Sequence, residues 1–287
     1  MTTQTTYKTQ RVNDVDVFYR EAGDRNAPVV LLLHGFPTSS HQFRNLIPQL
    51  ADEYRVIAPD LPGFGATVAP PRGEFDYTFD NLADTIDAFT ETLGLERFAL
   101  YVFDYGAPVG MRIASRHPER ISAIVTQNGN SYEEGLTDAW APLRAYWADG
   151  SDENRNALRG LLARETTEWQ YFEGTPDERR SNISPDSIDH DQAILDRDAE
   201  IQLDLFRDYG SNVALYPRWQ DYLREAQPPV LAIWGKNDPF FAPEGAEAFK
   251  RDVPNAEVDY LDGGHFVLET HTTEIADRMR RFLGRVI

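Results

Sequence analysis

Six short apolar runs, spaced along the chain, limit its possible folds more than any other feature. They span residues 29–34, 55–60, 98–103, 121–127, 229–234 and 256–261. Runs of this length predict β-strands, and several have almost no polar position, as expected where helices cover both faces of a sheet. Helical patterns alternate with them, the clearest being the apolar spacing from Phe79 to Leu93 after a potential cap at Thr78. The alternation predicts an α/β fold with a mainly parallel sheet flanked by helices.

Two departures from this alternation define the organisation of the chain. Residues 7–12 and 15–19 flank Asn13-Asp14 and predict an opening hairpin. Residues 131–227 are rich in charge, tryptophan and tyrosine and show helical rather than strand spacing. We interpret this segment as an inserted helical cap over the carboxyl ends of the strands, with residues 1–130 and 228–287 forming the core. The polar stretch 178–191 within the cap is expected to be a loop.

Charge and composition narrow the classes of function. Asp and Glu total 47 against 28 Lys and Arg, a net charge of −19. This charge repels nucleic acid, anionic membranes and anionic substrates, and favours a small neutral organic substrate. The absence of cysteine excludes a thiolate nucleophile and a cysteine metal site. Because the first ten residues lack a signal segment and apolar stretches such as Val29–Leu33 are far too short to span a membrane, we expect a cytoplasmic protein, monomeric or homodimeric.

One carboxylate stands where a strand pattern turns directly into a helix pattern. Asp104 follows the run 98–103 and precedes Tyr105-Gly106 and a helical segment at 107–114. Such a strand–turn–helix exposes the central side chain above the sheet and aims the next backbone N–H groups at the same space, which is the context of a catalytic nucleophile. Asp is also a common helix cap, so the local pattern by itself leaves both roles open.

Two further strand ends complete a catalytic set. Asp238 follows the run 229–234 within WGKNDP, and His265 follows the run 256–261 within LDGGHF. The order of nucleophile, acid and histidine, each at the carboxyl end of a strand, predicts that Asp104, Asp238 and His265 act together.

Longer motifs carry a resemblance that covers nearly the whole chain. HGFPTSSHQFRNLIPQL (34–50), APDLPGFGAT (58–67) and GGHFVLET (263–270) resemble segments of the α/β-hydrolase superfamily. The aspartate at position 104 resembles the branch that contains epoxide hydrolases and haloalkane dehalogenases. The resemblance implies an oxyanion hole formed by the backbone N–H groups of Phe36 and Tyr105, with no metal or organic cofactor. His34 and Glu269 are expected to hold the neighbouring loops by hydrogen bonds.

The use of a carboxylate as nucleophile indicates which kind of carbon atom the enzyme attacks. Attack on an ester or amide would form a reactive anhydride, whereas attack on a saturated carbon forms an ordinary ester. His265, oriented by Asp238, would then activate water against the carboxyl carbon of Asp104. The sequence therefore predicts a hydrolase that acts at saturated carbon.

The leaving group is predicted from the resemblance. Epoxide hydrolases protonate the ring oxygen with two cap tyrosines, and Tyr171 and Tyr216 occupy similar places in the order of segments. With the HGFP motif, these residues favour an epoxide hydrolase that forms a vicinal diol. We expect Phe36, Tyr105 and Trp169 to line the substrate pocket.

Two other readings stay open. Val102 and the stretch PTSSHQFRN resemble haloalkane dehalogenases, and Trp140, Trp147 or Trp169 could bind a halide. A protein of this fold can also keep its pocket as a ligand-binding protein after losing catalysis, although no member of the expected triad is missing here.

Overall fold

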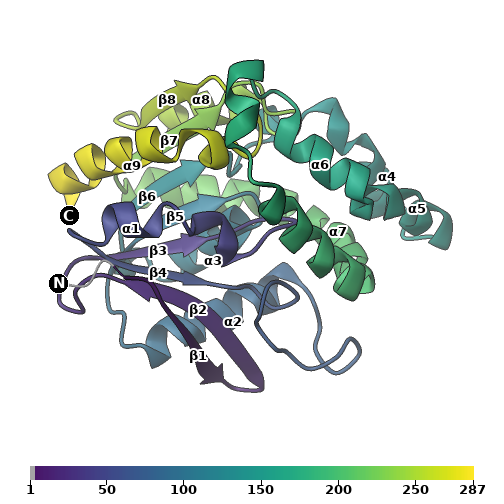
Figure 1. The fold of residues 1–287 in the computed structure, drawn as a ribbon, viewed down its shortest axis with the longest axis horizontal. Coiled ribbons are helices and arrows are strands. Elements are labelled where there is room, and N and C mark those ends of the chain that lie inside the picture. Colours follow the sequence, from purple (N-terminus) through teal and green to yellow (C-terminus); the bar gives the residue numbers. More distant parts are fainter. Residues whose placement is uncertain (1–3) are drawn as a thin grey trace.

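The computed structural model describes residues 4–287, which form an eight-stranded sheet in the order β1-β2-β4-β3-β5-β6-β7-β8 (Figure 1). Strand β2 is antiparallel to both of its neighbours, β1 and β4, and every other neighbouring pair is parallel. The strands are β1 (Thr6–Val12), β2 (Val15–Ala22), β3 (Val29–Leu33), β4 (Arg55–Pro59), β5 (Phe98–Phe103), β6 (Ile121–Gln127), β7 (Val230–Gly235) and β8 (Glu257–Leu261). The predicted hairpin is confirmed, although β2 extends three residues beyond its predicted end, and the six other predicted strands are confirmed to within one residue at either end.

Helices cover both faces of the sheet, as the continuous apolar runs require. Helices α2 (Phe79–Thr92), α3 (Gly106–Arg116) and α8 (Pro243–Asp252) pack on one face, and α1 (Ile47–Leu50) and α9 (Val267–Val286) on the other. Successive residues of β5 alternate between the two cores: Leu100 and Val102 join the first, and Tyr101 and Phe103 the second. Thr78 caps α2 by accepting a hydrogen bond from the backbone N–H of Asn81, as predicted.

A helical insertion separates β6 from β7. It contains α4 (Ala141–Ala148), α5 (Asp152–Ala157), α6 (Arg164–Phe172) and α7 (Pro185–Ala226). In Figure 1, α4, α5 and α6 lie at one end of the molecule, far from both termini. None of the helices within residues 4–287 has the length and hydropathy to cross a membrane.

The prediction of a loop at 178–191 is wrong, because residues 177–182 form a 3-10 helix and α7 begins at Pro185. The buried residues at the start of α7 include the polar Ser187 and Asp191, which masked the helical pattern. The Ser187 hydroxyl donates to Glu269, and Asp191 accepts from the Tyr171 hydroxyl. Tertiary hydrogen bonds thus replace the apolar contacts that a sequence pattern can reveal.

The first turn of α3 lies against β3, and Gly106 makes this approach possible. A Cβ atom at position 106 would overlap the backbone carbonyl of Leu33. Gly160, in contrast, has open space around its missing Cβ.

We therefore expect Gly106→Ala to lower the free energy of unfolding by about 2 kcal/mol or more, because the backbone contact cannot relax without moving β3 or α3. Urea unfolding measures the loss. Gly160→Ala is the control and should stay within about 0.5 kcal/mol of the parent; equal stability of the two variants would contradict the proposed close contact.

Candidate active site

Asp104 lies in the turn between β5 and α3, with a left-handed backbone (φ 45°) that residues other than glycine seldom adopt. Its side chain is only 6% exposed. The turn packs closely on the loop after β3, where a Cβ at Gly35 would overlap the Asp104 side chain. The surrounding fold therefore holds a strained residue in place, an arrangement typical of functional sites.

The Asp104 carboxyl faces the backbone donors that the resemblance assigned to an oxyanion hole. Its Oδ1 accepts a hydrogen bond of 2.6 Å from the Phe36 N–H. Burial raises the pKa of Asp104 to about 6, although the charge of His265 and the N–H groups of Phe36 and Tyr105 act in the opposite direction. Asp104 is thus an ionisable carboxylate with few partners, and its ionised form is available at neutral pH.

His265 and Asp238 form a buried pair beside this carboxyl. The distance from His265 Nδ1 to Asp238 Oδ2 is 2.8 Å, and the two residues are 2% and 6% exposed. Burial lowers the pKa of His265, but the negative charge and hydrogen bond of Asp238 and the charge of Asp104 outweigh it, so the pKa is raised. The pairing orients the imidazole and supports its positive form, as a general base requires.

Asn128 is a site residue that the sequence analysis missed. It follows β6 with φ 47°, and its side-chain amide donates to Asp238 Oδ2 at 2.7 Å while its Oδ1 accepts from the Gly235 N–H at 2.9 Å. Gln127 donates to Asn128 Oδ1 and to the backbone carbonyl of His265. The sequence feature that could have identified Asn128 is the polar pair Gln127-Asn128, which ends a predicted strand as the triad residues do.

His34 and Glu269, which the sequence analysis expected to hold neighbouring loops, both make hydrogen bonds there. The Leu61 N–H donates to His34 Nε2 at 2.9 Å, next to the loop that carries Phe36. Glu269 accepts from Arg44 through both carboxyl oxygens, at 2.9 and 3.0 Å. These bonds hold the loop after β3 against the start of α9.

Asp104 and His265 open into one small cavity of about 40 Å³. Its walls are mostly apolar and come from both the core and the helical insertion: Phe36, Asp104, Tyr105, Trp140, Leu143, Leu161, Gln170, Phe206, Phe240 and His265. Phe36 and Tyr105 are therefore found where the sequence analysis expected them. Trp169 is 40% exposed and packs edge-on against Phe240, and its neighbour Gln170 lines the cavity instead.

The two tyrosines predicted to protonate an epoxide do not line this cavity. Tyr171 stacks on Phe266, and its hydroxyl donates to Asp191 at 2.6 Å on the other side of α6. Tyr216 is buried and accepts a hydrogen bond of 3.3 Å from Asn130. Burial raises the pKa of the Tyr216 hydroxyl. The Tyr209 hydroxyl and the Asp104 carboxyl are close enough to affect this pKa as well.

Two of the three cap tryptophans considered as halide donors, Trp140 and Trp147, have their indole N–H groups in use. Trp140 Nε1 donates to the backbone carbonyl of Phe240 at 2.9 Å, and Trp147 Nε1 to that of Phe206 at 2.8 Å. Their rings pack with Tyr209 into an aromatic wall on the insertion side of the cavity.

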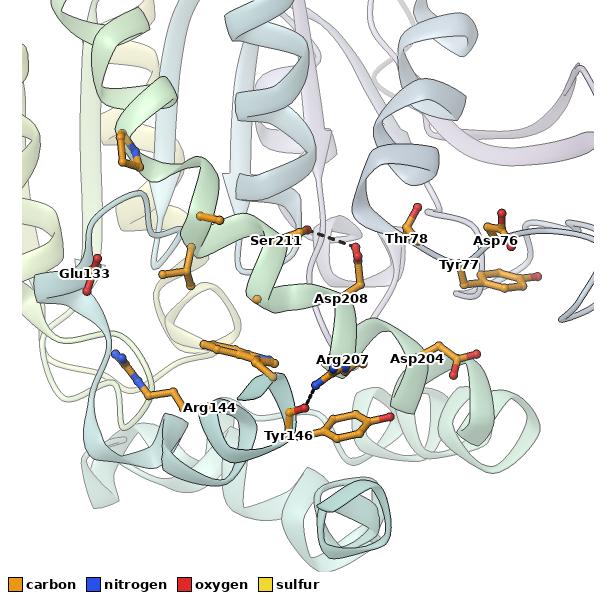
Figure 2. Close-up of a pocket in the computed structure, with 15 residues that line it drawn as sticks. Asp76, Tyr77, Thr78, Glu133, Arg144, Tyr146, Asp204, Arg207, Asp208 and Ser211 are labelled. Carbon is orange, nitrogen blue, oxygen red and sulfur yellow. Dashed lines mark hydrogen bonds between the residues drawn. The ribbon is translucent and has the colours of Figure 1, made fainter. Parts of the chain in front are cut away.

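A larger hollow of about 850 Å³ lies outside this wall, between the insertion and the start of α2 (Figure 2). Its labelled residues are mostly charged or hydroxylated, including Asp76, Arg144, Asp204 and Asp208. It is an open surface groove and contains no member of the triad, so the small inner cavity is the candidate site. Within residues 4–287, no group of three or more histidine or carboxylate side chains is arranged to hold a metal ion.

The raised pKa of Asp104 means that ionising this buried carboxyl opposes folding. The unfolded value is 3.8 and the folded value about 6, so the cost is absent below about pH 4 and fully present above about pH 6. With about 1.4 kcal/mol per pKa unit, it amounts to roughly 3 kcal/mol.

Asp104→Asn keeps the acceptor for Phe36 and removes the charge, so we expect it to stabilise the protein at pH 8 and to lose this advantage at pH 4. Unfolding midpoints of both proteins across this range measure the difference. A constant difference from pH 4 to pH 8 would contradict a raised pKa. Intact mass must confirm that the asparagine has not deamidated.

Residues 28–272 match the family model described as the alpha/beta hydrolase fold. The chain is 46% identical to an uncharacterized hydrolase of Saccharomyces cerevisiae, covering 95% of each protein. It is 42% identical to haloalkane dehalogenase 1 of Mycobacterium tuberculosis, covering 88% of this chain and 82% of that protein. The crystal structure of an epoxide hydrolase from Vigna radiata matches with a TM-score of 0.76 and 25% identity, covering 98% of each chain. The chain is therefore a hydrolase of the α/β-hydrolase-fold family, in the branch of the haloalkane dehalogenases and epoxide hydrolases.

Proposed function

We propose that this hydrolase acts on a small, neutral, apolar substrate at a saturated carbon, through a covalent ester on Asp104. The observation that carries the proposal is the Asp104 carboxyl, which opens into the same apolar cavity as His265 while His265 Nδ1 is held by Asp238 at 2.8 Å. By the usual measure one water occupies about 10–15 Å³. A cavity of about 40 Å³ therefore suits a molecule of only a few heavy atoms.

The proposed reaction has two steps. An Asp104 oxygen forms a bond to the substrate carbon while the bond to the leaving group breaks and its electron pair departs with that group. His265 then takes a proton from water, and the hydroxide adds to the carboxyl carbon of Asp104. The N–H groups of Phe36 and Tyr105, which face this carboxyl, stabilise the oxyanion. Its collapse breaks the bond to the alkoxide, which takes the proton from His265 and leaves as the alcohol.

A halide is the leaving group that the cavity supports best. An epoxide oxygen needs a proton as its ring opens, and Tyr105 carries the one hydroxyl among the lining residues. Burial raises the pKa of Tyr105 well above its ordinary value, which makes it a weak acid. Halide needs no proton, and relatives 42% identical to this chain are named haloalkane dehalogenases.

Epoxide hydrolysis, which the sequence favoured, is the second candidate. The hydroxyls of Tyr209 and Tyr216 lie within the electrostatic range of Asp104, beside the aromatic wall. The likeness to the Vigna radiata epoxide hydrolase supports the same chemistry.

A His265→Gln variant distinguishes the two candidates, because His265 is required to hydrolyse the ester but not to form it. After mixing with a bromoalkane, the peptide containing Asp104 should gain the mass of the substrate less hydrogen bromide; with an epoxide it should gain the whole substrate mass. Asp104→Asn is the control without adduct. Wild-type turnover of a substrate that never labels Asp104 in the stalled variant would rule out the covalent mechanism.

The tyrosines give a separate prediction. Tyr171→Phe should leave the rate of adduct formation within about twofold of the parent, but destabilise the protein by about 1–3 kcal/mol, because Asp191 loses a buried partner. Tyr216→Phe should slow epoxide opening about 10²-fold if epoxides are substrates, and leave bromoalkane displacement unchanged. Rapid-mixing measurements with both substrates, alongside thermal unfolding, test these outcomes; slow epoxide opening by Tyr171→Phe alone would overturn the assignment of Tyr171 to a structural bond.

A further inference from the structure

Asp191 is a buried carboxyl group of the helical insertion that the proposed reaction does not use. It lies on α7, is 0% exposed, and accepts a 2.6 Å hydrogen bond from the Tyr171 hydroxyl through Oδ2. Among residues 4–287, its other oxygen, Oδ1, has no hydrogen-bond partner. Burying a carboxyl group with so few partners costs stability, and apolar side chains would fill the same space at lower cost. Asp191 is therefore a candidate for a role beyond folding.

The groups around Asp191 come from several parts of the chain. Burial raises the pKa of Asp191 to about 7, and the charge of Glu269 adds to the rise, whereas the hydroxyls of Tyr171 and Thr38 and the charge of Arg44 oppose it. Tyr171 lies on α6, Thr38 on the loop after β3, and Glu269 at the start of α9. Asp191 therefore lies where the insertion meets the loop after β3 and the helix that follows the catalytic histidine.

The Tyr171 ring connects Asp191 to the loop that carries His265. It stacks on Phe266, with ring centroids 4.0 Å apart and an angle of 10° between the planes. Phe266 follows His265 directly in the sequence, and these two rings meet edge-on, 5.3 Å apart at 89°. Because Phe266 and His265 share a peptide bond and a ring contact, a displacement of Phe266 also moves the imidazole.

The direction of the imidazole is not set by its hydrogen bond alone. The bond from Nδ1 to Asp238 fixes one ring atom, but it leaves the ring free to tilt about that atom. Aromatic rings packed around the imidazole limit this tilt: Phe103, Phe240, Phe241 and Phe266. The tilt matters for catalysis, because Nε2 must point at the water from which it takes a proton.

We propose that Asp191 is a positioning residue for the hydrolysis of the Asp104 ester. Through its hydrogen bond it holds the Tyr171 ring on Phe266, and this stack directs Nε2 of His265 at the attacking water. The inference rests on the proposed function and adds to it a residue that acts through others, since Asp191 does not line the cavity. Alkylation of Asp104 does not use His265, so a loss of this support should affect the second step of the reaction alone.

The experiment follows the ester on Asp104 by rapid quenching and mass spectrometry, which measures its formation and its hydrolysis separately. The substrate is bromoethane or 1,2-epoxypropane, whichever labels Asp104 in the His265→Gln variant. Asp191→Leu removes the acceptor for the Tyr171 hydroxyl. It should slow hydrolysis about 10²-fold, as for a catalytic group misplaced by about 1 Å, and keep alkylation within about twofold of the parent. Asp191→Asn keeps an acceptor and should hydrolyse the ester at close to the parent rate.

Tyr171→Phe breaks the same hydrogen bond from its other end and should also slow hydrolysis, so the test stands even if Asp191→Leu does not fold. The double variant should be no slower than Asp191→Leu, because both changes break one connection. Thr167→Val is the matched control. Thr167 donates to Gln192 at 2.9 Å, a buried bond between the same two helices that is not part of the stack on Phe266. This variant should lower the thermal midpoint and keep the parent rate of hydrolysis.

The pH dependence of hydrolysis provides a readout that lost stability would not move. The interaction with Asp238 raises the pKa of His265, and a tilted imidazole loses part of it. Because the neutral imidazole is the base, hydrolysis in Asp191→Leu should reach half its maximal rate at a lower pH than in the parent.

Two results would overturn the inference. One is equal slowing of alkylation and hydrolysis with an unmoved pH profile, and the other is a parent rate of hydrolysis in both Asp191→Leu and Tyr171→Phe. If His265→Gln forms no adduct with either substrate, the proposed function fails instead, and the two failures are distinct.

Discussion

The parallel register of β5, β6, β7 and β8 is the constraint on which the site depends. Phe103 pairs with Gln127, Gln127 with Ile233, and Gly235 with Leu261. The residues that follow these strands therefore leave the sheet at one edge, where Asp104, Asn128, Asp238 and His265 meet although up to 161 positions separate them. Helices on both faces keep the register, since a strand that slipped by one residue would exchange its two apolar faces.

Two carboxylates, Asp104 and Asp238, are buried at this edge, and they differ in the number of their hydrogen-bond partners. Asp238 accepts from His265, from the Asn128 amide and from the N–H groups of Phe240 and Phe241. Asp104 accepts a hydrogen bond from the Phe36 N–H through one carboxyl oxygen, and burial raises the pKa of Asp104 to about 6. A fully bonded carboxylate orients its neighbour, whereas a carboxylate with unused lone pairs remains available as a nucleophile. The difference in partners thus separates the proposed roles of two chemically identical groups.

The helical insertion forms the side of the cavity that faces Asp104 and so limits which molecules can reach this carboxyl. Its aromatic wall of Trp140, Trp147 and Tyr209 closes the cavity on one side and uses its own indole N–H groups for backbone carbonyls. The remaining polar contribution of the insertion to the cavity is Gln170. In the proposed reaction, the size of the substrate and its leaving group therefore depend on the packing of the insertion, while residues of the core carry out the attack and the hydrolysis.

The sequence by itself determined the strands, the hairpin, the capped helix α2 and the turn that carries Asp104. These features follow from local periodicity and turn chemistry, which are readable from neighbouring residues. The order of Asp104, Asp238 and His265 also predicted a common edge, because parallel strands bring their carboxyl ends together. The helical start of α7 was missed, since its buried residues Ser187 and Asp191 are satisfied by partners distant in sequence. Only the tertiary structure decided which side chain of the WQYF stretch lines the cavity. Adjacent residues of a helix point about 100° apart, so the position of α6 against the core directs Gln170 to the cavity and Tyr171 to Asp191.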